Sequence, residues 1–175
     1  MAGCSHFGFW YRLSGEARCA PLGEFRNNTV HSSGRYGLWI FPNYSPRLSG
    51  KCSDRRPGLA QFTHFTSYSC DKAMESLHTT NIQFKNFITW DHHTFGMETL
   101  KIDWINSNYY NINSGPKVAD SVLIGNSNNN AKSSSPGLVI AQDRGNIISN
   151  VSFYNFQGRH PAIQSTDFAG IMPCP

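Results

Sequence analysis

The chain has 175 residues, long enough for one domain with a hydrophobic core. Only 15% of its residues are charged, against roughly 25% in an ordinary soluble domain, and 16 asparagines and 20 serines supply neutral polar groups instead. No run of about 18 apolar residues is present, which excludes a membrane-spanning helix. The net charge of +4 comes without the basic runs of nucleic-acid-binding modules, so we expect no nucleic-acid partner.

The positive charge is unevenly placed along the chain. Residues 1–58 carry eight Lys/Arg against three Asp/Glu, whereas residues 59–175 carry seven against eight. This asymmetry favours a solvated, Arg-rich edge, with a contact surface for an acidic polysaccharide or an anionic cell surface as the alternative.

The sequence predicts short strands separated by turns along the whole chain. The first predicted strand is the aromatic run at residues 3–13, and a second covers residues 37–41 and ends at Pro42. An irregular insertion rich in Pro, Ser and Arg follows at about 42–58. Residues 59–165 alternate short strands with polar turns, and the helical content we expect there is at most one turn, within Asp71–Ser76.

One short sequence motif recurs along the chain. Its copies begin at Phe25, Phe62, Phe84 and Phe153, and each is a short apolar/polar alternation with Asn or His near its centre. The second and third copies start 22 positions apart, which is typical of stacked coils that cannot bury their apolar face alone. The pattern predicts an all-β, single-stranded, right-handed parallel β-helix of about five to seven coils over residues 1–175.

The apolar members of the repeats should stack into the core. We expect its main members to be Phe62, Phe65, Phe84, Phe87, Ile124, Val139, Ile140, Phe153 and Phe156. Asn28, Asn86 and Asn155 should stand at the corners of the coils, where an amide satisfies backbone groups of the bend and its stacked neighbours. Contact with a sugar is the alternative role for these amides.

Cysteines and glycosylation sequons point to an oxidising compartment. None of the five cysteines has zinc-site spacing, and Asn27, Asn43 and Asn150 each begin an Asn-X-Ser/Thr sequon. Cys52 and Cys70 bracket the point where this loop rejoins the repeats and are predicted to form a disulfide, with Cys4–Cys19 as a second pair. The odd cysteine count leaves one free thiol or a partner outside this chain.

The segment from Gly3 to Leu13, followed by the segment from Gly23 to Pro42, resembles the fibrocystin and fibrocystin-L family. The likeness continues around Phe84-Lys85-Asn86-Phe87 and Pro136–Ile140. It implies a fragment of a very large extracellular or single-pass membrane protein with parallel β-helix repeats of the pectin-lyase type. The chain enters and leaves in strand, so we expect its partners to be neighbouring coils of the same polypeptide, with extracellular glycans as further partners.

Two functions follow as hypotheses. The first is a non-catalytic extracellular module that acts as a rigid spacer and recognition surface in a fibrocystin-like receptor and needs no cofactor. The alternative is a polysaccharide-active β-helix glycosidase or lyase, acting on a hyaluronan-type substrate with Ca²⁺ as its cofactor. Such an enzyme needs clustered carboxylates on one face, for which Asp103 and Asp120 are candidates. Trp104 and Tyr110 are candidate sugar-stacking residues.

Asp91-His92-His93 is the most ligand-like short cluster of the chain. Neighbouring residues of a strand point to opposite faces, so the two histidines would bind one ion together only from a turn. We therefore predict an exposed turn here and no metal site.

Overall fold

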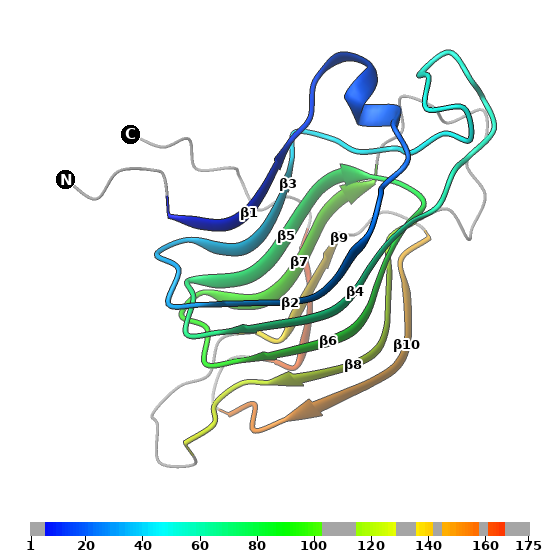
Figure 1. Ribbon diagram of the computed structural model, residues 1–175. Helices are drawn as coiled ribbons and strands as arrows, with labels where there is room; N and C mark the ends of the chain where they lie inside the picture. Colours follow the sequence, from blue (N-terminus) through cyan, green and yellow to red (C-terminus); the bar gives the residue numbers. More distant parts are fainter. Residues whose placement is uncertain (1–5, 103–114, 129–135, 142–144, 158–160, 167–175) are drawn as a thin grey trace.

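The computed structural model is built of parallel β-strands in two sheets (Figure 1). It describes residues 6–102, 115–128, 136–141, 145–157 and 161–166. Successive strands alternate between a six-stranded sheet, in the order β1-β3-β5-β7-β9-β11, and a five-stranded sheet, in the order β10-β8-β6-β4-β2. Every ladder between named strands is parallel. The predicted all-β class is confirmed, and the alternation is compatible with a β-helix.

The strands of the six-stranded sheet are β1 (Phe7–Arg12), β3 (Tyr36–Phe41), β5 (Lys72–Thr79), β7 (Phe95–Ile102), β9 (Leu138–Ala141) and β11 (Ile163–Thr166). Those of the five-stranded sheet are β2 (Phe25–His31), β4 (Ala60–Tyr68), β6 (Ile82–Trp90), β8 (Lys117–Ile124) and β10 (Ile147–Tyr154). One 3₁₀-helix, η1 (Gly15–Cys19), lies between β1 and β2. Among the residues that the structure describes, no helix is long and apolar enough to cross a bilayer.

The repeated phenylalanines form the core between the sheets. Phe25, Phe62 and Phe84 stand in one row across β2, β4 and β6, with neighbouring ring centroids 5.0 and 5.6 Å apart. Phe65 and Phe87 form the next row, at 5.1 Å. Opposite them, the six-stranded sheet contributes buried Leu38, Met74, Met97 and Leu138. Each buried phenylalanine contributes about 1.5–3 kcal/mol through loss of apolar surface from water.

The remaining predicted core residues are less central. Val139 is buried but belongs to no part of this cluster, and Ile140, Phe153 and Phe156 are partly buried against it. Ile124 is half-buried. The copy at Phe153 is out of register, because Phe153 pairs with Leu123, whereas Val118 and Ile148 occupy the row of Phe84. Equating Phe153 with the earlier copies is therefore wrong.

Residues 72–76, where we expected at most one helical turn, belong to strand β5 instead. Met74 and Ser76 point into the interior there, fully buried. Glu75, between these two residues, is buried as well, so the strand lacks the simple alternation of buried and exposed side chains that marks a strand in a sequence.

The loop between β3 and β4 is tied to η1 by a disulfide between Cys19 and Cys52. The backbone N–H of Cys52 also donates to the Glu16 carboxylate, at 2.6 Å. Cys70 is a free, buried thiol next to Ser67. The predicted pairs Cys52–Cys70 and Cys4–Cys19 are therefore wrong, because the loop folds back on η1, while Cys70 lies inside the turn between β4 and β5.

Candidate functional site

Each strand of the five-stranded sheet turns a corner at a residue with left-handed backbone (Figure 1). These residues are Asn27, His64, Asn86, Asp120 and Asn150, with φ between 50° and 57°. Asn, Asp and His adopt this conformation more readily than other residues with a side chain. The pairing on both sides of each corner places the five in one row, which we call the corner row.

Side chains of the corner row contact one another along the stack. The Nδ2 of Asn86 lies 3.3 Å from His64 Nε2, so the imidazole accepts this hydrogen bond when its proton is on Nδ1. Asn150 Nδ2 donates to Asp120 Oδ1 at 2.9 Å. The other Asp120 oxygen is 3.5 Å from Lys85 Nζ. The row thus presents amide, imidazole and carboxylate groups at solvent.

A shallow groove of about 410 Å³ runs beside the corner row and crosses β2, β4, β6 and β8. Its floor is a second row of outward side chains, Thr29, Thr66, Ile88 and Val122. Adjacent parallel strands are about 4.8 Å apart, so the groove extends over roughly 14 Å. It therefore combines a polar wall with a floor of two threonine and two aliphatic side chains.

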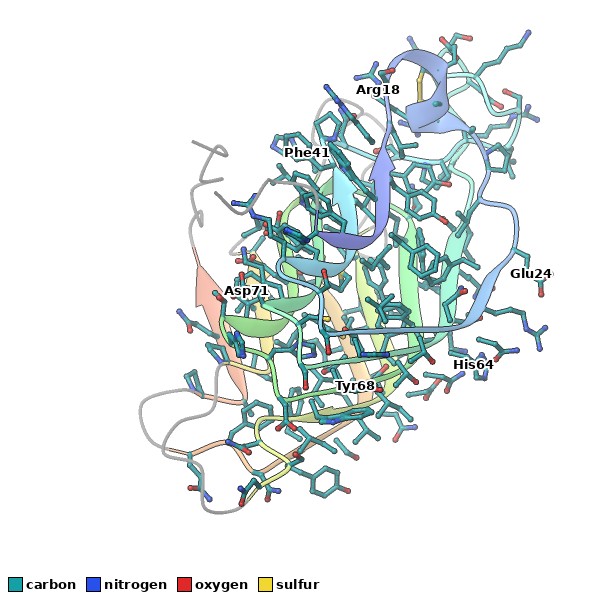
Figure 2. The ribbon with its side chains drawn as sticks, turned by 60° about the vertical axis from the view of Figure 1, so that its left-hand side comes forward. Arg18, Glu24, Phe41, His64, Tyr68 and Asp71 are labelled. Carbon is teal, nitrogen blue, oxygen red and sulfur yellow. A yellow bond between two sulfur atoms is a disulfide. The ribbon has the colours of Figure 1, made fainter. Side chains whose placement is uncertain are left out.

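Aromatic rings form a third row on this face. His31 stacks on Tyr68 with ring centroids 5.0 Å apart, and Tyr68 stacks on Trp90 at 4.5 Å, nearly parallel. Ile124 and Tyr154, which is 54% exposed, continue the row on β8 and β10. Figure 2 shows His64 at the outer edge of the strands. The floor of the groove lies between the corner row and these rings.

Asp120 is ionised and accepts a hydrogen bond from Asn150. The hydrogen bond from Asn150, followed by Lys85, lowers the pKa of Asp120. Among the described residues that line the groove it is the one carboxylate. Glycoside hydrolysis needs two, one of them protonated. The structure thus places the predicted Asp120 in the groove, and no second carboxylate is found among the described residues of its lining.

The structure describes only some of the other predicted site residues. Asp103, Trp104 and Tyr110 lie outside the described residues. Asp91 accepts from the backbone N–H of Ser127 at 2.6 Å and ties two turns together.

The two histidines after Asp91 lie in different environments. His92 is buried, with its ring nitrogens 3.3 Å from the Cys70 carbonyl and 3.2 Å from the Ser67 carbonyl, whereas His93 is exposed. Burial lowers the pKa of His92 to about 4, so it is neutral at pH 7. Within the described ranges no group of three potential metal ligands is found.

A carboxylate pair that the sequence reasoning missed lies on the six-stranded sheet. Glu75 and Glu98 are paired in register on β5 and β7, and both are buried, at 3% and 1% exposure. Glu75 accepts hydrogen bonds from Tyr36 Oη (3.0 Å), Trp39 Nε1 (2.7 Å) and Lys72 Nζ (3.0 Å). Its two oxygens are therefore fully engaged.

Glu98 is held as a neutral acid. Burial raises the pKa of Glu98 to about 8, with the Glu75 charge adding to the effect and Lys72 opposing it. Glu98 Oε2 is 3.7 Å from Lys72 Nζ, too far for a hydrogen bond. A protonated and an ionised carboxyl side by side are what acid–base catalysis uses. Here, however, neither carboxyl is open to solvent.

A sequence signal for this pair exists. The segment Met74-Glu75-Ser76-Leu77 is followed one repeat later by Met97-Glu98-Thr99-Leu100. Equivalent positions of successive coils stack, so extending the repeat into this strand would have paired the two glutamates.

Comparison with known proteins finds sequences of fibrocystin-L and fibrocystin. The chain is 33% identical to human fibrocystin-L over 171 residues, which cover 89% of the chain, and 34% identical to mouse fibrocystin-L over 93% of the chain. It is 28% identical to dog fibrocystin over 85% of the chain. The chain spans only about 3–4% of the length of these curated relatives. No family model and no solved structure matches it.

Proposed function

Nearly the whole chain is homologous to a short stretch of the fibrocystin family, and we propose that it is a non-catalytic extracellular module of such a protein. In this proposal the chain forms a single-stranded right-handed β-helix that serves as a rigid spacer. The alternation of strands between two parallel sheets supports it, because each coil then stacks on the next.

The recognition surface of this module is the groove on the five-stranded sheet, and its ligand is a glycan. The observation that carries the proposal is the parallel course of the corner row, the floor and the stacked rings. Amide groups both donate and accept hydrogen bonds, which suits sugar hydroxyls. The stacked rings of Tyr68 and Trp90 add apolar ring edges beside them. Such a mixture of apolar area with a few polar groups is typical of ligand sites.

An extracellular location is part of the proposal. The Cys19–Cys52 disulfide and the three sequons support it, since disulfides persist and Asn-linked glycans are added along the secretory route. In the intact protein the neighbouring coils of the same polypeptide would be the first partners of the module.

Glycan binding by wild-type protein and by Trp90→Ala tests the recognition role. We expect the wild type to bind oligosaccharides on a glycan array, and the variant to bind them about tenfold more weakly, equivalent to ~1.4 kcal/mol. The control is Trp10→Ala, because Trp10 is 43% exposed on β1 of the other sheet, whereas Trp90 is half-buried. Equal loss in both variants, or no glycan binding by the wild type, would contradict the proposal.

A second candidate function is a polysaccharide-active enzyme, and the Glu75–Glu98 pair is the observation that favours it. Parallel strands bring the two carboxyls to adjacent rungs, at a spacing near that of retaining glycosidases. Burial and the three hydrogen bonds to Glu75 weigh against this role and favour a structural one.

A further inference from the structure

We infer that Asn27 and Asn150 carry N-linked glycans and that Asn43 does not. The inference rests on the extracellular location given under the proposed function, because the modification takes place on exported chains. All three asparagines begin a sequon, so the sequence treats them alike. Their surroundings in the fold separate them.

Asn27 and Asn150 occupy the corner row, on β2 and β10, which are the two edge strands of the five-stranded sheet. Both side chains are exposed, and so are the hydroxyl residues of their sequons, Thr29 and Ser152. Left-handed backbone at the corner directs the chain away on both sides of each asparagine. A bulky group attached at either position extends into solvent without displacing a strand.

The transfer itself is compatible with the contacts that these residues make. The amide nitrogen Nδ2 attacks the anomeric carbon of a lipid-pyrophosphate-linked oligosaccharide; the new N–C bond replaces one N–H, the proton passes to a base, and the lipid pyrophosphate leaves. A primary amide has two N–H groups, and Asn150 uses one of them toward Asp120, at 2.9 Å. The second is the one replaced, so this hydrogen bond persists after modification.

Asn43 lies in a different environment. Its Oδ1 is buried without a hydrogen-bond partner, and the two residues that complete its sequon, Tyr44 and Ser45, are each 3% exposed. The Ser45 hydroxyl accepts from Thr80 Oγ1 at 2.9 Å, and its backbone N–H donates to the Arg18 carbonyl, also at 2.9 Å. A glycan at Asn43 would have to break this packing between the loop, η1 and β5.

The two glycans would flank the recognition groove. The strands between the edges, β4, β6 and β8, carry most of the groove floor and the stacked pair Tyr68–Trp90. The attached sugars would thus stand at its two ends and leave its middle open.

Site occupancy in the full-length protein, expressed in mammalian cells and recovered from the secretory route, tests the inference. Enzymatic removal of Asn-linked glycans in ¹⁸O-water converts each occupied asparagine to a mass-labelled aspartate. We expect the label at Asn27 and Asn150 and none at Asn43. Asn27→Gln and Asn150→Gln should each remove one step of electrophoretic mobility shift, and Asn43→Gln should remove none. Thr29→Ala and Ser152→Ala repeat the loss without touching the corner residues.

Label at Asn43, or empty Asn27 and Asn150 in a secreted molecule with an oxidised Cys19–Cys52 pair, would overturn the inference. If all sites are empty and Cys19 is reduced in a cytosolic protein, the proposed extracellular location fails and the inference fails with it. Full occupancy of Asn27 and Asn150 together with no glycan binding by the groove supports the inference and refutes only the recognition role.

Discussion

Glu75 and Glu98 show how two carboxyl groups are buried side by side on adjacent strands. Two ionised carboxylates at this spacing would repel one another strongly. The proton retained by Glu98 removes that repulsion, and Lys72, which also lies over the Phe95 ring, balances the charge of Glu75. The two carboxyl groups can therefore lie side by side on β5 and β7 at neutral pH, but only while Glu98 keeps that proton.

Glu98→Gln is expected to weaken the dependence of stability on pH. The pKa of Glu98 is about 8 in the folded state and about 4.3 when unfolded, so between these values the folded state binds the extra proton. The free energy of unfolding then falls as pH rises through this window. His92 acts in the opposite sense, with its contribution lost as pH falls from about 6.5 toward 4, so the range from pH 6.5 to 8 isolates Glu98.

Urea unfolding at several pH values measures this effect. Between pH 6.5 and 8 the wild type should lose stability, and Glu98→Gln should lose clearly less. Glu24→Gln is the control, since Glu24 forms an exposed pair with Arg26. Equal slopes for the wild type and Glu98→Gln would show that Glu98 is ionised in the folded protein.

At the scale of the strands, the corner row fixes where each coil bends. The sequence correctly indicated amide side chains at the bends, but it assigned them imprecisely. Asn86 is in the row, whereas Asn27 and not Asn28 holds the corner of β2. Asn155 belongs to the following bend, where its Nδ2 donates to the Asn126 carbonyl at 3.1 Å. Two bends per coil could not be told apart from residue type alone.

Substitutions at Asn86 test the backbone role of the corner. Asn86→Ala should destabilise the fold by about 1–2 kcal/mol, because alanine in a left-handed conformation places Cβ too close to the following carbonyl. Asn86→Gly should cost less or nothing, since glycine adopts this φ freely. Thermal denaturation of the two variants decides, and an alanine variant as stable as the glycine variant would contradict the account.

Removal of the Cys19–Cys52 bond tests the link between the loop and η1. The bond joins residues 33 apart in the sequence, so its loss should reduce stability by about 3–4 kcal/mol. Cys19→Ser, Cys52→Ser and the double variant should be equally destabilised in urea titrations. A double variant that loses the sum of the two single effects would mean that the cysteines act independently.

The repeats of the sequence carry the core, and interruptions in the repeats limit what can be read from them. Phe62 and Phe84 are correctly aligned because no insertion separates their coils. The coil from β6 to β8 contains a longer connection, so the spacing of the motif is not constant. The sequence motif therefore suggests Phe153 as the equivalent of Phe84, whereas the equivalent residue in the structure is Ile148. The groove and the Cys19–Cys52 pair depend on contacts between distant segments, which no local pattern encodes.

At the scale of the whole molecule, the two sheets present different chemistry. The six-stranded sheet carries a buried acid pair, and the five-stranded sheet carries polar and aromatic rows on its outside. This division is the basis of our proposal that the module binds glycans on one face without cleaving them. The enzyme alternative differs from it in one respect, the access of a polysaccharide to Glu75 and Glu98.

The chain length of polysaccharides after incubation with the full-length ectodomain tests that difference most directly. Fluorescent hyaluronan and pectin-like polymers, with and without Ca²⁺, are incubated with the protein and sized by gel filtration. We predict that a polymer comigrates with the protein and keeps its length, and that Trp90→Ala reduces the comigration. Shortening of a polymer that is lost on Glu75→Gln, Glu98→Gln or Asp120→Asn would show that the module is an enzyme.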